Sequence, residues 1–469
     1  MNGQWSSSDN GLTFDVYNPA DGSMLGKVPR MAQSETARAI DAAALALPIW
    51  SSKTAKERSI ILRRWYELIL ENQSDLATII TAEMGKPIAE SLDEIAYGAS
   101  FIEWFAEESK RIYGETIPST SIDRRFVVIK QPVGVVASIT PWNFPNAMIT
   151  RKCSPALAAG CTVVIKPAED TPFSALALAE LAERAGIPKG VINVVTGDPV
   201  EIGAEMTSNS KVRKLSFTGS TPVGKLLMKQ CAATVKKVSM ELGGNAPFIV
   251  FDDADIDAAV AGAMASKFRN TGQTCVCANR ILVQDNIYEL FIKKLVKEVT
   301  KLNIGPGLVS NATQGPLINK KALEKVESLV NDAINKGADV VLGGKRSEQG
   351  YTFFEPTILT NVDTSMHIAS EEIFGPIAAI YRFKTEEEAL IIANDTPFGL
   401  AAYFYSREIG RVWRVSEALE YGMVGVNAGN VSSEVAPFGG IKESGVGREG
   451  SKYGIEEFLE IKYMCFGGI

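Results

Sequence analysis

The chain has 469 residues, of which 46% are hydrophobic and 22% are charged, and its formal net charge is −7. A chain of this length is expected to form two or three globular domains, and the absence of a basic cluster argues against nucleic acid as a partner. No apolar run reaches the ~20 residues that cross a bilayer, and the first residues resemble neither a signal nor a transit peptide, so we expect a cytoplasmic protein with no membrane partner.

The first 110 residues have the periodicity of helices. Ser34 is suited to cap a helix that Pro48 would end. Thr54 and Glu57 have the spacing of a capping box at the start of the next helix. A third helix is expected to end at Gly85, and Pro87 would open a fourth. Packing in a hydrophobic core is a sufficient explanation for the apolar stripes of these helices.

After residue 125, short β-rich runs alternate with segments of helical composition. The runs cover residues 126–129, 133–139, 162–165, 191–195 and 214–217. Continuous apolar strands that alternate with helices are typical of a parallel sheet covered on both faces. We therefore predict an α/β protein with a Rossmann-type, doubly wound nucleotide-binding domain.

A turn that could hold a phosphate group follows the strand ending at Phe217. Gly219 and Ser220 lie between this strand and a helix start, where backbone N–H groups are available to an anion. The segment differs from the Gly-x-Gly-x-x-Gly fingerprint of dinucleotide sites. An ordinary strand-to-helix turn remains the alternative.

A second α/β block begins after residue 244. Strands are expected at residues 248–251, 281–283, 340–342 and 424–426, with a helix over residues 321–335. A cleft is expected between the two blocks. Glu241 and Cys275 should lie near its two walls.

Cys275 is the candidate nucleophile, because the turn-rich segment Asn-Thr-Gly-Gln-Thr before it would leave the thiol accessible. A thiol nucleophile needs a base or a lowered pKa. The one histidine, His367, is remote in sequence and is interpreted as structural, so Glu241 is the candidate base. The alternative is that Cys275 is an ordinary small apolar residue. The six cysteines include no Cys-x-x-Cys pair, and we expect no metal site.

Seven motifs together resemble the aldehyde dehydrogenase superfamily in residue type, order and spacing, over nearly the whole chain. They are Pro141-Trp142-Asn143-Phe144-Pro145, Lys166-Pro167-Ala168-Glu169, Phe217-Thr218-Gly219-Ser220, Glu241-Leu242-Gly243-Gly244, the Cys275 segment, Glu371-Glu372-Ile373-Phe374-Gly375-Pro376 and Pro437-Phe438-Gly439-Gly440. Within the superfamily, the segments around Arg151, Arg269 and Ser433 resemble the succinate-semialdehyde dehydrogenases.

The resemblance implies three structural parts. The first is an NAD-binding domain of residues 1–113 and 134–243, and the second is a catalytic domain of residues 244–445. The third is a small β oligomerisation element of residues 114–133 and 446–469. The expected assembly is a homodimer or a homotetramer.

The resemblance also implies a reaction. The Cys275 thiolate would add to an aldehyde carbonyl, and the Asn143 side-chain amide and the Cys275 backbone N–H would stabilise the oxyanion. Hydride would leave to the nicotinamide. Glu241 would then activate a water molecule that hydrolyses the thioester to the acid.

NAD is the implied cofactor, and NADP is possible. Lys166 and Glu169 would hold the adenosine ribose, and a carboxylate at position 169 accepts a hydrogen bond from a 2′-hydroxyl but repels a 2′-phosphate. Glu372 and Phe374 would position the nicotinamide ribose and ring, although a surface salt bridge and core packing are their alternatives. The full expected set is Pro141, Trp142, Lys166, Pro167, Ala168, Glu169, Phe217, Gly219, Ser220, Val223, Leu242, Glu372 and Phe374.

Arg151 and Arg269 are expected to select an aldehyde with a distal carboxylate, and Ser433 would add a hydroxyl donor. Arginines that are solvated or paired for structural reasons are the alternative. Asn427-Ala428-Gly429-Asn430 matches the family less closely, which leaves the length of the acid chain open. The expected substrate is succinate semialdehyde, with glutarate semialdehyde as the alternative.

Cys277 is expected to act as an oxidation switch on Cys275, because a neighbouring thiol can resolve a sulfenic acid reversibly. The Cys-Val-Cys pattern resembles that of some succinate-semialdehyde dehydrogenases that are redox regulated, and the resemblance implies the same regulation here. The alternative is that Cys277 is a small buried residue at the start of a strand.

Three other functions compete with this interpretation. A cofactor-free thiol acyltransferase would not need the Lys166 and Gly219 motifs, and a non-catalytic member of the fold would not need Cys275, Glu241 and Asn143 together. A CoA-acylating dehydrogenase is the nearest alternative, since Glu241 is the feature that favours water as the acyl acceptor.

Overall fold

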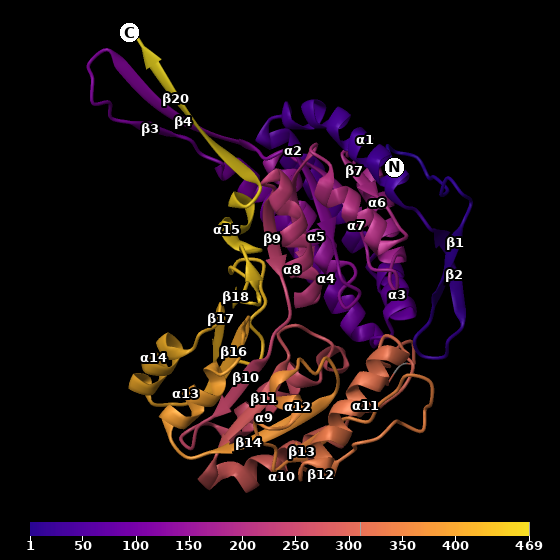
Figure 1. Cartoon of the computed structure of the whole chain (residues 1–469), viewed down its shortest axis with the longest axis vertical. Helices are drawn as coiled ribbons and strands as arrows, with labels where there is room; N and C mark the ends of the chain where they lie inside the picture. The colour runs from indigo at the N-terminus through magenta and orange to yellow at the C-terminus, as the bar shows by residue number, and fades with distance from the viewer. Residues whose placement is uncertain (310, 469) are drawn as a thin grey trace.

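The computed structural model describes residues 1–309 and 311–468 (Figure 1). A β-hairpin of β1 (Thr13–Tyr17) and β2 (Met24–Pro29) precedes four helices. These helices are α1 (Gln33–Ser51), α2 (Ala55–Glu71), α3 (Gln73–Met84) and α4 (Ile88–Glu108). Four helices were expected here, and the structure confirms all four.

The helix ends show which local signals dominate. Thr54 and Glu57 form the predicted capping box, with each side chain bonded to the other's backbone N–H. The prediction that Ser34 caps α1 is wrong, because the helix already starts at Gln33, and Glu35 accepts the N–H of Ala32 instead. Pro48 does not end the helix either. It lies in the last turn, where the chain continues as helix to Ser51.

The first large sheet has the strand order β19-β9-β8-β5-β6-β7, and all of its pairs are parallel except β19 with β9. The strands are β5 (Val135–Ile139), β6 (Thr162–Lys166), β7 (Ile192–Val194), β8 (Val212–Thr218), β9 (Lys237–Glu241) and β19 (Gly445–Val446). The helices of this domain are α5 (Ala147–Ala159), α6 (Phe173–Arg184), α7 (Pro199–Ser208) and α8 (Thr221–Cys231). The predicted doubly wound fold is confirmed.

Alternation along β5 explains why helices cover both faces of this sheet. Val135 and Ala137 belong to the core shared with α1 and α7, whereas Val136 belongs to the core shared with α2, α4, α5 and α6. From β5 the chain winds outward through β6 and β7, and it then returns to β8 on the other side. The strand order therefore reverses between β5 and β8, which is where open α/β sheets bind ligands at their carboxyl ends.

The second large sheet has the order β12-β13-β14-β11-β10-β16-β17, with one antiparallel pair at the β12 edge. Its strands are β10 (Ala246–Val250), β11 (Ala278–Gln284), β12 (Asp339–Leu342), β13 (Thr357–Thr360), β14 (Ile377–Phe383), β16 (Ala401–Tyr405) and β17 (Met423–Val426). Its helices are α9 (Ile256–Lys267), α10 (Tyr288–Val299), α11 (Lys320–Asn335), α12 (His367–Ser370), α13 (Glu386–Asn394) and α14 (Ile409–Ala418). The strands expected from the sequence are present, and β13, β14 and β16 were not among them.

The tail of the chain crosses back to the first domain. β18 (Ile441–Lys442) pairs with β15 (Phe398–Gly399), and β19 then joins the edge of the first sheet. The helix α15 (Ser451–Glu456) packs on α4 and α5. Residues 445–458 therefore contact the first domain, and the third sheet takes only β20 from the tail.

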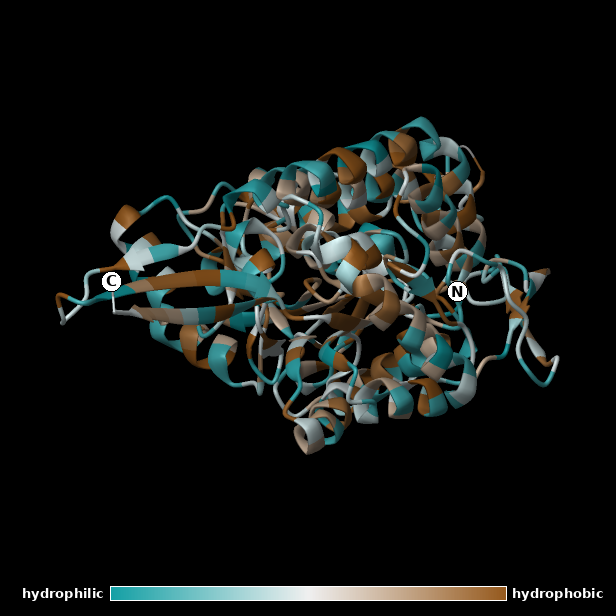
Figure 2. Ribbon diagram, turned by 90° about the horizontal axis from the view of Figure 1, so that it is seen from above, coloured by the Kyte–Doolittle hydropathy of each residue, from teal (hydrophilic) through white to brown (hydrophobic). Residues whose placement is uncertain are grey.

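The third sheet projects from the body of the molecule (Figure 1). It consists of β3 (Glu115–Ile117), β4 (Arg124–Pro132) and β20 (Leu459–Gly467), all antiparallel. Ile117, Ile461, Tyr463 and Phe466 are exposed on it, and Figure 2 shows hydrophobic stretches along its strands. In the described part of the chain, no helix has the length and apolar character that crossing a membrane requires.

Candidate active site

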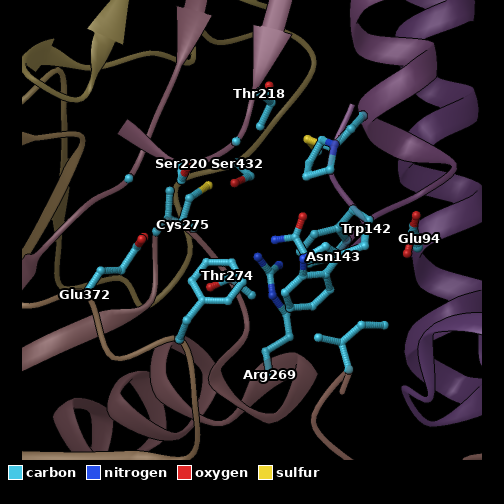
Figure 3. Close-up of a pocket in the computed structure, with 18 of the residues that line it drawn as sticks. Glu94, Trp142, Asn143, Thr218, Ser220, Arg269, Thr274, Cys275, Glu372 and Ser432 are labelled. Atoms are coloured by element: carbon cyan, nitrogen blue, oxygen red, sulfur yellow. The ribbon is translucent and has the colours of Figure 1, made fainter. Parts of the chain in front are cut away.

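A cavity of about 790 Å³ lies between the two large domains. Trp142 and Asn143, which follow β5, line it together with Gly219 and Ser220, which follow β8. Cys275 lines the cavity from the second domain. The cavity thus lies at the point where the strand order of the first sheet reverses, and Figure 3 shows residues of both domains around it.

The loop before Cys275 has an unusual backbone that fixes the thiol. Asn270 and Thr271 have φ values of 52° and 55°, which few non-glycine residues adopt. At Gly272 the φ is +74°, and a Cβ there would meet the Gly375 carbonyl oxygen at 2.2 Å. Gln273 ties the loop to the neighbouring segment, because its side-chain oxygen accepts the Ile318 N–H at 2.9 Å. Cys275 is left partly exposed at the cavity wall.

Burial raises the pKa of the Cys275 thiol to about 12. The positive charges of Arg151 and Arg269 act against this rise, whereas Glu372 and Glu241 add to it. Without cofactor or substrate, the thiol is therefore protonated at neutral pH. Its reaction requires a group that removes the proton.

Glu241 has the properties of such a base. It ends β9 and is buried, and its Oε2 atom has no hydrogen-bond partner among the described residues. Burial, and next the charge of Glu449, raise its pKa well above the usual value, although Arg151 and Lys152 oppose the rise. A carboxylate with a raised pKa is a stronger base near neutral pH. The residues after it, Leu242 and Gly243, line the cavity, whereas Glu241 itself does not.

Glu449 joins two buried cations behind the cavity. One of its oxygens lies 2.7 Å from the Arg151 guanidinium and the other lies 2.5 Å from the Lys152 ammonium. Burial tends to raise the pKa of Glu449, but Lys152 and Arg151 hold it below its usual value. Arg151 also stacks on the Phe438 ring at 4.0 Å, so its position in the cavity wall is fixed from two sides.

Asn143 is held by the second domain. Its side-chain Nδ2 donates to the Gln273 backbone carbonyl at 3.0 Å. Its backbone carbonyl accepts from Lys86 Nζ at 2.7 Å and from Asn270 Nδ2 at 3.1 Å. Lys86 is fully buried and pairs with Glu94 at 2.6 Å. Sequence reasoning missed both Lys86 and Glu94. Lys86 lies in the loop between α3 and α4, and no local pattern in the sequence reveals its contact with Asn143.

The expected cofactor residues fall into two groups. Pro141, Trp142, Gly219, Ser220, Leu242, Glu372 and Phe374 line the cavity, whereas Lys166, Pro167, Ala168, Glu169, Phe217 and Val223 do not. In the second group, Lys166 and Glu169 form an ion pair in which Lys166 is buried and Glu169 is partly exposed. Phe217 packs beneath the turn, because a Cβ at Gly219 would lie 2.5 Å from its ring.

Phe374 contacts the first domain, and Glu372 binds the start of the second domain where the chain enters it. The Glu372 carboxylate accepts the Gly244 N–H at 3.0 Å, and burial raises its pKa to about 7. The Phe374 ring contacts Trp142 edge to face, with centroids 5.4 Å apart. Figure 3 shows Trp142 and Asn143 facing Cys275 across the cavity.

Arg151 and Arg269 both line the cavity that contains Cys275. Ser433 does not line it, and its hydroxyl donates to Glu434 at 3.3 Å. Its neighbour Ser432 does line the cavity, as do Asn430 and Tyr97, which sequence reasoning also missed. The residue that faces the cavity depends on the backbone direction of this loop, and no periodic pattern in the sequence reports that direction.

Cys277 is buried, and its thiol lies 3.5 Å from the Lys267 carbonyl and 3.6 Å from the Ala278 carbonyl. It does not line the cavity, and both Cys275 and Cys277 are free thiols. Across the described residues, no cluster of three or more histidine, cysteine or acidic side chains could hold a metal ion.

A doubly wound domain, a second α/β domain and a thiol with a buried carboxylate near the crevice between them are the arrangement of an aldehyde dehydrogenase. Residues 5–464 match the aldehyde dehydrogenase family, and the chain belongs to that family.

Two curated relatives and one solved structure are similar over the whole chain. A succinate-semialdehyde dehydrogenase (NADP+) of Escherichia coli is 64% identical over 467 residues, which cover 100% of this chain and 97% of that protein. A glutarate-semialdehyde dehydrogenase of Pseudomonas aeruginosa is 63% identical over 469 residues, with 100% and 97% covered. A crystal structure of an E. coli NADP-dependent enzyme has a TM-score of 0.99 at 64% identity and likewise covers 100% and 97%.

Proposed function

We propose that this aldehyde dehydrogenase oxidises succinate semialdehyde to succinate with a nicotinamide cofactor, NAD in preference to NADP. The observation that carries the proposal is that Arg151 and Arg269 line the same cavity as Cys275. Guanidinium groups suit a carboxylate better than any other side chain, so they favour an aldehyde with an acid at its far end. Similarity to enzymes named for succinate and glutarate semialdehyde supports the same class of substrate.

In the proposed reaction, Cys275 forms a bond from its sulfur to the aldehyde carbon and transfers its proton to a base. Glu241 is the base, since burial has raised the pKa of its carboxyl group. The oxygen becomes an oxyanion, which the free N–H of the Asn143 amide stabilises. A bound nicotinamide would supply the acceptor for the hydride that leaves the aldehyde carbon. Glu241 releases the first proton to solvent and then takes a proton from a water molecule that attacks the thioester. The Cys275 thiolate leaves and regains this proton.

The residues around the crevice fit such a cofactor. Gly219 and Ser220 line the cavity and lead into the N-terminus of α8, which favours the negative charge of a pyrophosphate. Lys166 and Glu169 would hold the adenosine ribose, and Glu372 and Phe374 the nicotinamide end. The Glu169 carboxylate is the basis of the NAD preference, because it would repel a 2′-phosphate.

The test compares initial rates for succinate semialdehyde, glutarate semialdehyde and butanal, each with NAD and NADP. We expect the highest kcat/KM for succinate semialdehyde with NAD, and Cys275→Ala should abolish oxidation while NAD binding persists. Equal rates for butanal and the two acids would refute the substrate class. A higher kcat/KM with NADP would refute the role given to Glu169.

Glutarate semialdehyde is the second candidate substrate, because a relative of 63% identity is named for it. The rate comparison distinguishes the two acids directly. A CoA-acylating reaction is the other alternative. Only free acid should form when CoA is present, and an acyl-CoA product would exclude Glu241 as the group that activates water.

Two further proposals concern regulation and assembly. Cys277 would resolve an oxidised Cys275. Peroxide should therefore inactivate the enzyme and dithiothreitol should restore its activity, whereas in Cys277→Ala the loss should be irreversible. Equal recovery of both proteins, or no 275–277 disulfide in peptide masses, would exclude the switch. The exposed apolar residues of the projecting sheet are suited to a homodimer or homotetramer, which light scattering would measure.

A further inference from the structure

Tyr97 carries an unused hydrogen-bond donor in the cavity wall. Its side chain comes from α4 and lines the cavity opposite the second domain. The hydroxyl oxygen is buried and has no hydrogen-bond partner of ordinary geometry among the described residues. Burial raises the pKa of Tyr97, and its neighbour Ser432 lowers it as a donor to this oxygen, which leaves the phenol O–H itself without an acceptor. A buried polar group without a partner is uncommon in a folded protein, and it calls for a specific occupant.

The surroundings of this hydroxyl are those of an anion site. The Tyr97 ring packs edge to face on Phe101 with centroids 5.0 Å apart, and the guanidinium of Arg151 lies 5.5 Å from that same Phe101 ring. Arg269 lies on the other side of the cavity, 5.5 Å from the Phe144 ring. Burial, the largest effect, raises the pKa of the Tyr97 hydroxyl, whereas the positive charges of Arg151 and Arg269 lower it. The hydroxyl therefore lies within the field of both guanidinium groups.

The other polar groups on this face of α4 already have partners. Glu94 accepts from Lys86 and from two backbone N–H groups, and Glu90 accepts the Asn270 N–H at 2.8 Å. Asp93 is exposed to solvent at the cavity rim. Trp104 Nε1 on α4 also lacks a partner among the described residues, but it does not line the cavity. Tyr97 is thus the one cavity-lining residue of this helix that offers a neutral, unpaired donor among the described residues.

We propose that the Tyr97 hydroxyl donates a hydrogen bond to the distal carboxylate of the substrate, between Arg151 and Arg269, and so contributes to the selection of acid-bearing aldehydes. The inference rests on the proposed function, because it assigns a third donor to the same anion. A phenol donates to a carboxylate without adding charge, so it increases selectivity by a bond that an uncharged aldehyde cannot accept.

Tyr97→Phe removes only the hydroxyl and keeps the ring that packs on Phe101. A hydrogen bond to a charged group corresponds to roughly a 10- to 100-fold effect, so kcat/KM for succinate semialdehyde should fall by that factor. The kcat/KM for butanal, which has the same chain length and no acid, should change less than about 3-fold. The inhibition constant of succinate against butanal oxidation should rise by a factor similar to that seen for the semialdehyde.

A matched control is available in the same chain. Tyr381, on β14, also has a buried hydroxyl without a partner among the described residues, but it lies in the core of the second sheet and away from the cavity. Tyr381→Phe makes the same chemical change and should leave both aldehydes unaffected. The melting temperatures of both variants should equal or slightly exceed that of the parent, because neither hydroxyl makes a bond in the protein.

Arg269→Ala separates failure of this inference from failure of the proposed function. If Arg269→Ala impairs the semialdehyde selectively and Tyr97→Phe does not, the substrate class stands and the role of Tyr97 is refuted. If neither variant discriminates between the two aldehydes, the proposed substrate class is refuted as well. Equal losses of kcat/KM for both aldehydes in Tyr97→Phe would also overturn the assignment. An unchanged kcat/KM for both aldehydes would overturn it too, because the hydroxyl would then bind only water.

Discussion

Glu449→Gln should destabilise the protein strongly, since it removes one negative charge and leaves two buried cations. The exposed fractions of the side chains are 7% for Glu449, 3% for Arg151 and 1% for Lys152, so water cannot replace the lost carboxylate. Breaking a buried ion pair by removing one partner costs about 3–5 kcal/mol, because the remaining charge stays desolvated. We expect a loss in this range in the free energy of unfolding.

Asp41→Asn provides a control with the same chemical change at the surface. Asp41 lies 2.5 Å from Lys211, a distance equal to that of the Glu449–Lys152 pair, but both side chains are about half exposed. Surface pairs contribute about 0–1 kcal/mol. Unfolding in guanidinium chloride is followed by tryptophan fluorescence. The midpoint and slope of each transition give the free energy of unfolding of each variant, which is compared with that of the parent.

The pH dependence gives a second measure. The pKa of Glu449 is lower in the folded protein, so its contribution to stability is present above the pKa of an unfolded glutamate, about 4.3, and is lost as the pH falls below it. Glu449→Gln should lack this acid-dependent loss. If its midpoint shifts no more than that of Asp41→Asn, burial does not determine the strength of this ion pair and the reasoning is wrong.

Three further predictions concern the reaction. Asn143→Ala should lower kcat by roughly 10²- to 10³-fold with either aldehyde, the usual effect of one oxyanion donor, and steady-state rates measure it. Glu241→Gln should slow the attack of Cys275 and block thioester hydrolysis, so a covalent acyl-enzyme should form slowly and then persist as a mass increase on Cys275, and normal turnover would contradict its role as the base. Because burial raises the pKa of Cys275 to about 12, the thiolate fraction increases with pH, and alkylation of the cofactor-free enzyme by iodoacetamide should accelerate nearly tenfold per pH unit between pH 7 and 9. A rate that levels off below pH 9 would show that the thiol ionises more easily than its burial implies.

Features that depend on neighbours in sequence could be predicted well. The alternation of strands and helices identified the doubly wound fold, and the capping box at Thr54 formed as expected. The turn-rich segment pointed to Cys275, and the resemblance to the aldehyde dehydrogenases pointed to Asn143 and Glu372; all three line the cavity. The ends of α1 were predicted incorrectly, since Glu35 supplies the cap that Ser34 was expected to supply.

Features that depend on distant contacts could not be predicted. Glu449 contacts Arg151 only because the tail returns to the first domain, and nothing near Arg151 in the sequence reports that path. Lys86 reaches the Asn143 carbonyl from a bend between two helices. The strands β14 and β16 are buried apolar runs, which periodicity alone does not distinguish from buried helices.

The pairing of β4 with β20 has a consequence for biosynthesis. β4 is synthesised early, but its full-length partner follows both large domains, so a nascent chain carries β4 with one edge largely unpaired throughout translation. Unpaired strand edges with exposed apolar residues favour aggregation. Completion of the projecting sheet must therefore wait until residues 459–467 have left the ribosome. Nascent chains stalled before residue 459 should therefore aggregate more readily than the finished chain.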